Sequence, residues 1–268
     1  CRAVMAAYLA RIHRLNPDYN AIVNLAPDDR LLAEAEACDA ELAQGRSRGW
    51  MHGMPQAIKD TGHALGFPST QGCTLLKDVM PTQDSLMTAR MKAAGCIVVG
   101  KTNMPEFGLG SHTFNSLFGA TPNAWDPMVS AGGSSGGAAV ALAQRLLPVA
   151  DGSDFMGSLR NPAAWNHVFG LRPSQGRVPL LPAADVWVAQ LGTEGPMART
   201  VRDLARLLAV QAGPDLRAPL ALAHAWSAPA LPQDTGPLRG LRVGWLADLG
   251  GHLPFEPGIL PLCEAALQ

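Results

Sequence analysis

The sequence predicts an α/β fold in which helices alternate with short strands buried on both faces. Residues 30–44 repeat apolar side chains every three to four positions, with acidic residues between them, as in an amphipathic helix. Residues 96–99 form a continuous apolar run, which is typical of a strand covered on both sides. A helix predicted over 84–94 directly precedes that run, and this alternation is characteristic of α/β folds.

The first half of the chain carries recognisable helix boundaries. The helix predicted over 30–44 begins at Pro27 and Asp28 and ends at Gly45. The following segment, 53–60, is short and enters from a turn. These signals place a helical region before the first predicted strand.

The middle of the chain is rich in glycine and serine without being a linker. The helix over 84–94 is expected to begin at Asp84 and to end at Gly95. Further on, the run 132–137 leads directly into the apolar segment 138–147, which we expect to form a buried helix. Flexible linkers have polar flanks, whereas apolar structure follows this run.

The rest of the chain continues the same alternation. A short strand is expected over 147–150, and an amphipathic helix over 200–212 ends at Gly213. Residues 214–239 are rich in proline and alanine and predict a surface excursion. The apolar residues of 241–246 predict a late strand.

The composition is that of a globular chain with little net charge. Hydrophobic residues make up 47% and charged residues 16% of the 268 residues, which suits a buried core rather than disorder. The 21 basic and 22 acidic residues give a net charge of −1, and no basic cluster stands out, so we expect no nucleic-acid partner. No run of membrane-spanning length and no signal peptide is visible, although a chain that starts at Cys1 leaves a missing leader open.

The cysteines and histidines point away from disulfides and metals. The cysteines are odd in number, widely spaced and without a CxxC pair, which predicts reduced thiols in a cytoplasmic protein. The seven histidines show neither an HExxH motif nor a paired spacing. We therefore expect no metal and no cofactor. The cysteines are Cys1, Cys38, Cys73, Cys96 and Cys263.

Two glycine-rich motifs match known patterns without the structural context that those patterns need. Residues 95–102 fit the phosphate-binding GxxxxGK[ST] pattern, but their interior is the predicted strand itself, and Pro105 interrupts the helix that should follow. Residues 132–136 fit the GxSxG nucleophile elbow, but the preceding residues 123–130 lack the apolar run of a strand. Neither motif is a good basis for a function.

A combination of three residues is more informative. Ser134 lies in a glycine-rich turn, Ser158 follows 24 residues later, and one helix and one strand between them can bring the two together. Lys59 is one of only four lysines, and a lysine, unlike an arginine, becomes a neutral base when it is buried. Each residue alone has an ordinary explanation, as a turn former or a surface charge. Their order and contexts together favour a shared catalytic role.

Five segments around these residues match motifs of the amidase signature family in the same order. The chain resembles that family over about residues 21–213. The five segments are 53–60 (GMPQAIKD), 100–107 (GKTNMPEF), 132–137 (GGSSGG), 157–163 (GSLRNPA) and 170–178 (GLRPSQGRV).

The resemblance implies a Ser–cis-Ser–Lys triad. Ser158 would attack an amide carbonyl after passing its proton to Ser134, which passes it to neutral Lys59. Because the ordinary pKa of lysine is about 10.4, burial must lower the pKa of Lys59 for it to act near neutral pH. The resemblance also implies that the Gly133–Ser134 peptide bond is cis and that Ser135 assists by hydrogen bonding.

The resemblance further implies an oxyanion hole built from main-chain N–H groups. It makes Asp154 and Arg160 braces of the turn that carries the nucleophile, without a catalytic role. Many family members have two glycines before the nucleophile, and here Met156 replaces the first; the N–H donor is kept, while the side chain narrows or lines the substrate pocket. The expected donors are Phe155, Met156, Gly157 and Ser158.

For the architecture, the resemblance implies a mixed, largely parallel-stranded sheet covered by helices on both faces and truncated at the C-terminus. We predict one domain over 1–268, with N-terminal helices over 1–50, a catalytic core over 51–213, and the excursion and the start of a later sheet over 214–268. Met104, Glu106 and Phe107 are expected to be core and helix-cap residues rather than substrate contacts.

The expected function is hydrolysis of a small-molecule carboxamide, such as a linear amide, an aryl amide or a small lactam. One alternative is an amidotransferase subunit that releases ammonia from glutamine for a partner protein. Another is a noncatalytic fragment or scaffold, because the chain ends at Gln268 where family members continue. A homodimer stays open, and the physiological amide cannot be named from the sequence.

Overall fold

The computed structural model describes residues 1–187, 191–229 and 242–267. The chain divides into two units, 1–229 and 230–268, and each is described by itself. The predicted active-site residues all belong to the unit 1–229. The expectation of one domain over 1–268 stays a prediction.

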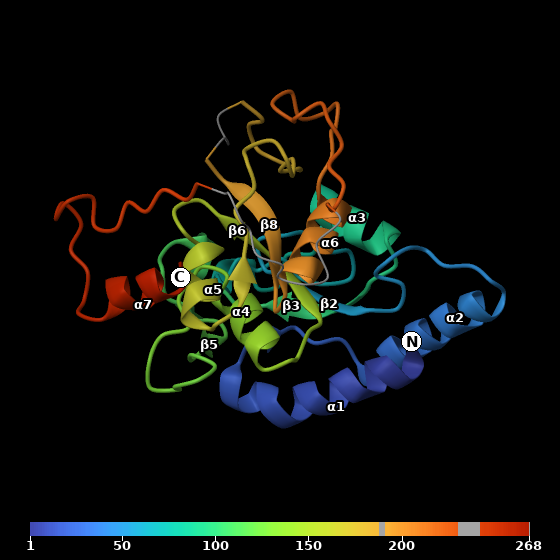
Figure 1. Ribbon diagram of the computed structural model, residues 1–268. Helices are drawn as coiled ribbons and strands as arrows, with labels where there is room; N and C mark the ends of the chain where they lie inside the picture. Colours follow the sequence, from blue (N-terminus) through green and yellow to red (C-terminus); the bar gives the residue numbers. More distant parts are fainter. Residues whose placement is uncertain (188–190, 230–241, 268) are drawn as a thin grey trace. The chain divides into compact units, whose positions relative to one another are not determined.

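Helices carry most of the regular structure in the described residues (Figure 1). Two long N-terminal helices pack against each other, and the second also contacts β3 (Ile97–Thr102). The helices predicted over 30–44, 84–94 and 200–212 are all present. The described helices are α1 (Arg2–Tyr19), α2 (Asp28–Ala43), α3 (Leu86–Ala93), α4 (Gly136–Ala143), α5 (Arg160–Trp165), α6 (Val201–Gln211) and α7 (Ile259–Ala265).

Short strands form the centre of the unit 1–229. β3 pairs with β2 in parallel and with β1 in antiparallel orientation, while β8 pairs antiparallel with both β6 and β7. A separate antiparallel pair joins β4 and β5. The remaining strands are β1 (Ile22–Val23), β2 (Pro55–Lys59), β4 (Phe114–Asn115), β5 (Gly119–Ala120), β6 (Val149–Asp154), β7 (Phe169–Gly170) and β8 (Thr193–Ala198).

The strand directions are mixed, as expected, but they are not largely parallel in the part of the chain that the structure describes. Only β2 and β3 form a parallel pair there. β7 and β8 are joined without the crossover helix that a parallel pair requires, and they run in opposite directions. β6 contacts β2 through the Asp151 carboxylate, which accepts hydrogen bonds from the Lys59 backbone N–H and the Gln56 side-chain amide. This contact places the ends of β2 and β6 beside each other.

The glycine-rich run continues into the most deeply buried helix of the unit. α4 contacts β3, β6 and β8, and every residue from Gly136 to Leu142 is buried. The helix ends at Ala143, earlier than expected, and Arg145 has a φ of 56° in the left-handed region. The strand expected over 147–150 correspondingly starts at Val149 and extends to Asp154. Polar residues that looked like loop residues therefore belong to a strand.

The predicted start of the helix over 84–94 is wrong for a local reason. α3 is capped by Ser85, whose hydroxyl accepts from the Thr88 N–H, and not by Asp84. Asp84 instead accepts from the Leu65 N–H and pairs with Lys92 at 2.7 Å. A carboxylate with these two partners is satisfied away from the start of the helix.

The second unit contains α7 and turns in its described residues. The late strand predicted over 241–246 is wrong for 242–246, which form no strand; Leu241 lies outside the described residues. Val243 and Leu246 are exposed, so the apolar pattern there does not report burial. The described residues 214–229 form no helix or strand, in line with the predicted excursion, whereas 230–239 lie outside the description.

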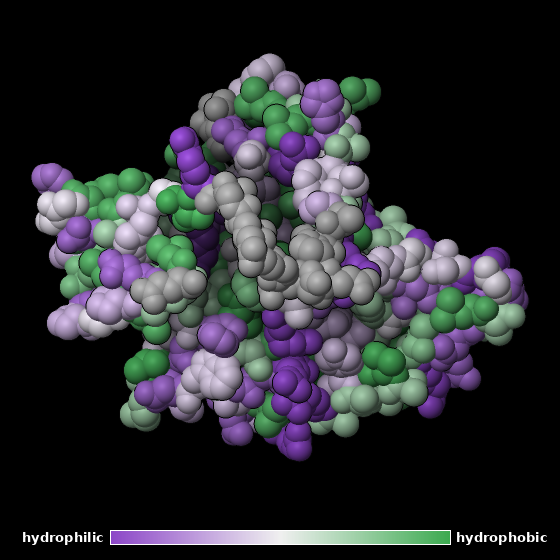
Figure 2. Space-filling view, in the orientation of Figure 1, coloured by the Kyte–Doolittle hydropathy of each residue, from purple (hydrophilic) through white to green (hydrophobic). Residues whose placement is uncertain are grey.

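The described surface is mixed in polarity. In Figure 2, hydrophilic and hydrophobic residues are interspersed over the described part of the face shown, without a broad hydrophobic belt. None of the helices in the described residues combines the length and the apolar character that crossing a membrane requires.

Candidate active site

Lys59 lies at the end of β2 and is buried. Its Nζ donates hydrogen bonds to Ser134 Oγ at 2.7 Å, to Ser135 Oγ at 2.9 Å and to Ser153 Oγ at 2.9 Å. Burial lowers the pKa of Lys59 to about 7, although the carboxyl groups nearby act in the opposite direction. A lysine with this pKa is neutral in a large fraction of molecules near neutral pH.

Ser134 and Ser135 reach Lys59 from the glycine-rich run. The Gly133–Ser134 peptide bond is cis, as expected. The Thr113 hydroxyl holds the run on both sides, because it donates to the Gly132 carbonyl and accepts from the Gly136 N–H. This clamp fixes the two serines at the start of α4.

Ser158 lies in the turn between β6 and α5, and it faces the same pocket as Ser134. The Ser135 N–H donates to the Ser158 carbonyl at 3.2 Å, which ties the two serine-bearing turns together. The structure therefore brings Lys59, Ser134 and Ser135 into direct contact and places Ser158 at a pocket that Ser134 also lines.

Asp154 organises the turn that carries Ser158. Its buried carboxylate accepts from the Gly157 and Leu159 N–H groups and from the Arg160 guanidinium. Burial by itself would raise the pKa of Asp154, but these hydrogen bonds outweigh burial and lower it. Arg172 adds a second cation at 3.4 Å, a partner that the sequence analysis did not identify.

The main-chain N–H groups expected to form the oxyanion hole differ in whether they already donate a hydrogen bond within the structure. The Gly157 N–H, one of the expected donors, donates to Asp154 Oδ1 at 2.7 Å in this structure. A carboxylate is a stronger acceptor than a neutral carbonyl and takes this N–H for the turn. The N–H groups of Phe155, Met156 and Ser158 donate to no group in the described residues.

Apolar and hydroxyl side chains together line the pocket that contains Ser134 and Ser158. Phe155 and Met156 are exposed at its edge, Met156 with 81% of its surface accessible. Phe107 also lines this pocket, so its expected role as a core or cap residue is wrong, whereas Met104 is buried as expected. Phe107 has a φ of 56°, a left-handed conformation that turns the chain at the edge of the pocket.

Three polar residues near Lys59 were missed in the sequence, and two of them, Asp151 and Glu194, are buried. Asp151 holds the Lys59 backbone N–H, Ser153 contacts Lys59 Nζ, and Glu194 is buried on β8. Burial raises the pKa of Asp151, and burial raises the pKa of Glu194 to about 8. Alternate residues of a strand share one face. A strand predicted to continue to Asp154 would therefore have placed Asp151 and Ser153 on the same face.

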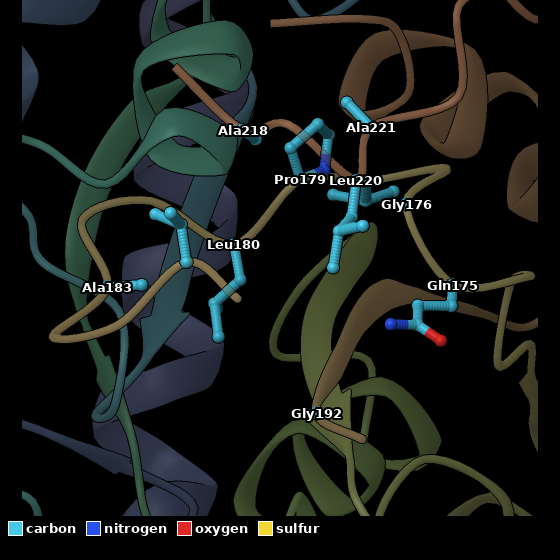
Figure 3. A pocket seen from close by; sticks show the side chains of 11 residues that line it. Gln175, Gly176, Pro179, Leu180, Ala183, Gly192, Ala218, Leu220 and Ala221 are labelled. Atoms are coloured by element: carbon cyan, nitrogen blue, oxygen red, sulfur yellow. The ribbon is translucent and has the colours of Figure 1, made fainter. Parts of the chain in front are cut away.

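A second cavity is lined by none of these residues (Figure 3). Its volume of about 40 Å³ admits a few water molecules but not an amide substrate. No titratable side chain lines it among the described residues, and Gln175 contributes its only side-chain amide there. The cavity therefore offers no nucleophile or base.

The chain resembles known proteins over nearly its whole length. The Amidase family model matches residues 3–268. A glutamyl-tRNA(Gln) amidotransferase subunit of Thermus thermophilus is 42% identical over 267 residues, covering 99% of this chain and 53% of that protein. The corresponding subunit of Chloroflexus aurantiacus is 43% identical over 267 residues, with 98% and 53% coverage. The chain thus spans about half the length of these curated relatives.

Solved structures share the architecture. A bacterial aryl acylamidase of the amidase signature family superposes with a TM-score of 0.80 at 36% identity, covering 84% of this chain and 47% of that one. A peptide amidase from Stenotrophomonas maltophilia gives a TM-score of 0.74 at 36% identity, covering 82% and 46%. These matches confirm the predicted α/β amidase signature fold. By sequence and by structure, the chain belongs to the amidase signature family.

Proposed function

We propose that this chain hydrolyses a carboxamide through an acyl-enzyme on Ser158, with Ser134 and Lys59 relaying the proton. The observation that carries the proposal is the buried Lys59 Nζ, 2.7 Å from Ser134 Oγ, with its pKa lowered to about 7. A serine hydroxyl is a weak nucleophile, and a neutral amine within hydrogen-bond reach is the base that activation requires.

The proposed reaction begins when Ser158 Oγ attacks the amide carbon and its proton passes through Ser134 to Lys59. The negative charge that forms on the carbonyl oxygen would be stabilised by the N–H groups of Phe155, Met156 and Ser158. Ser134 then returns the proton to the leaving amine, and water hydrolyses the acyl-enzyme. Asp154 keeps the turn in place throughout, with its two oxygens engaged by Gly157, Leu159 and Arg160.

The pocket favours a substrate with an apolar acyl or aryl group. Phe107, Leu109, Phe155 and Met156 line it, and no charged side chain does so among the described residues. A lining without charged side chains gives little recognition of the zwitterionic head of glutamine. A small-molecule amide is therefore our first candidate substrate.

A glutamine-hydrolysing component of an amidotransferase is the second candidate. The names of the relatives at 42% and 43% identity favour it, since those proteins are amidotransferase subunits. Its partners would be other subunits, whereas a simple amidase needs none. The cytoplasmic location inferred from the cysteines stays a prediction in either case.

Turnover of matched substrates tests the proposal. The purified chain is assayed with an apolar 4-nitroanilide and, separately, for ammonia release from glutamine. Ser158→Ala and Lys59→Ala should each lower kcat by at least about a thousandfold, because each removes a member of one catalytic unit. The control variants Ser47→Ala and Lys77→Ala change exposed residues and should retain the parent rate. Near-normal turnover in Ser158→Ala or Lys59→Ala would contradict the assignment.

A further inference from the structure

Glu194 is an unusual residue for the interior of a sheet. It lies on β8 with 4% of its surface accessible, and its Oε2 has no hydrogen-bond partner in the described residues. Glutamate is rarely this buried without a partner, because moving a carboxyl group from water without new hydrogen bonds costs free energy. An apolar side chain would stabilise this position better, so packing alone does not account for a carboxyl group here.

The strand register directs Glu194 toward the lysine. Glu194 lies opposite Ser153 in the antiparallel ladder between β6 and β8, and directly opposite residues share one face of a sheet. The Ser153 hydroxyl on that face accepts from Lys59 Nζ at 2.9 Å. Lys59, Ser153 and Glu194 thus follow one another across β2, β6 and β8.

The charged groups around the pair are few. Asp151 and Lys59 act on Glu194, while Asp151, Asp154 and Glu194 act on Lys59. The other elements packed against β8 add no buried charge, since α4 and β7 contain no charged residue and Asp203 on α6 binds Thr200. The arginines on α6 are exposed. Lys59 is therefore the one cation among the described groups that acts on Glu194.

We propose that Glu194 is a positioning residue of the relay, whose carboxylate stabilises the ammonium form of Lys59 and thereby sets the proton affinity of that base. This role of Glu194 rests on the proposed function in one respect, because the proposed function makes Lys59 the base. Burial, and Asp151 to a smaller extent, raise the pKa of Glu194 to about 8, whereas Lys59 acts to lower it, and Glu194 acts to raise the pKa of Lys59; the two groups are thus electrostatically coupled. A carboxylate that acts on the forming ammonium through space offsets part of the cost of placing that charge in the interior.

Lysine NMR titration tests this coupling without requiring activity. With only four lysines in the chain, ¹³Cε labelling gives few signals, and Lys59→Ala assigns the one from Lys59. In Glu194→Gln the Lys59 midpoint should move about one pH unit to lower pH, because the ammonium loses an opposite charge. Glu194→Asp, which keeps the charge, should restore most of the shift. Glu36→Gln, which changes an exposed carboxylate on α2, should leave the midpoint in place.

An unchanged Lys59 midpoint in folded Glu194→Gln would overturn the proposal. If that variant does not fold, ¹³Cδ-glutamate titration of the unmodified chain decides the question. A glutamate that titrates together with Lys59 supports the coupling. If no glutamate titrates above pH 6, the coupling is contradicted. The rate of serine labelling by a fluorophosphonate, followed against pH, adds a functional readout. A shift of its acid limb in Glu194→Gln supports the role, whereas a uniform loss at every pH indicates a structural one. If the unmodified chain is not labelled at Ser158, the proposed function fails, while the lysine titration still decides the role of Glu194.

Discussion

At the scale of residues, burial gives the site its chemistry. Lys59, Asp151 and Glu194 lie together in the interior, where the ionised form of each is costly, and their pKa values shift toward the neutral form. Asp154, also buried, shifts in the opposite direction because its oxygens are saturated with donors. Burial thus favours the neutral amine of Lys59, whereas hydrogen bonding favours the charged carboxylate of Asp154.

Asp154 is expected to be the residue that most stabilises the nucleophile turn. Asp154→Asn removes charge-assisted hydrogen bonds from Gly157, Leu159 and Arg160, and should lower the free energy of unfolding by about 2–3 kcal/mol. Urea denaturation measures this. Arg160→Gln is the comparison: because Arg160 is 56% exposed, it should cost less than about 1 kcal/mol. Equal costs for the two variants would contradict this view of the turn.

Met156 is expected to affect substrate choice more than stability. Its side chain is 81% exposed at the edge of the pocket, so Met156→Ala should change the free energy of unfolding by less than about 0.5 kcal/mol. The ratio of kcat/KM between a bulky and a small acyl anilide should change by about tenfold, since the edge of the pocket is altered. Met128→Ala is the matched control, because Met128 is 89% exposed and does not line the pocket. An unchanged ratio in Met156→Ala would exclude Met156 as a determinant of specificity.

Residues of the site could be predicted from the sequence only where a suitable residue type occurred in a recognisable sequence context, such as a glycine-rich turn. Ser134, Ser158 and Lys59 were recognisable because two glycine turns and a rare lysine occur in a definite order. Glu194 and Ser153 were not, because their roles depend on the pairing of β6 with β8, which is a contact between distant parts of the chain. The hydrogen bond from the Gly157 N–H to Asp154 was not predictable either, because it depends on the orientation of the Asp154 side chain.

At the scale of elements, the glycine run acts through close packing. A Cβ at Gly137 would lie 2.4 Å from the Asn103 N atom and 2.6 Å from the Ala21 carbonyl oxygen, both of them backbone atoms. Only glycine lets α4 approach the end of β3 this closely. The run is therefore a packing surface as well as the segment that carries two serines.

Gly137→Ala is expected to destabilise the unit 1–229 although alanine favours helices. The added methyl group forces α4 away from β3 and should lower the free energy of unfolding by about 1–3 kcal/mol. Chemical denaturation followed by circular dichroism measures the change. The control Gly244→Ala introduces the same methyl group where nothing lies within 4 Å, and should change stability by less than about 0.5 kcal/mol. A Gly137→Ala chain as stable as the parent would contradict the close-packing argument.

Element prediction succeeded where periodicity and boundary residues agreed. α6 follows its expected range, begins after the Thr200 cap and ends before Gly213. The strand expected over 241–246 failed because an apolar run shows only that residues are apolar, whereas a strand also needs a partner to pair with. For β6, only the apolar first half was predicted. The polar residues Asp151 and Ser153 interrupt the apolar pattern by which a buried strand is recognised, so the second half was assigned to a loop.

At the scale of the whole molecule, the unit 1–229 contains every residue of the proposed relay. The family match extends beyond it to 3–268, and the relatives are about twice as long as this chain. The residues of the proposed relay and its positioning residue lie on β2, β8 and the two serine turns.

Serine labelling tests the central claim most directly. The chain is treated with a fluorophosphonate between pH 5 and pH 9, and the modified peptide is located by mass spectrometry. We expect modification at Ser158, with a rate that rises through about pH 7 as Lys59 loses its proton and becomes a base. Lys59→Ala should abolish labelling, and Lys77→Ala should not. Modification at Ser134 in place of Ser158, or a Ser158 rate independent of Lys59, would contradict the account.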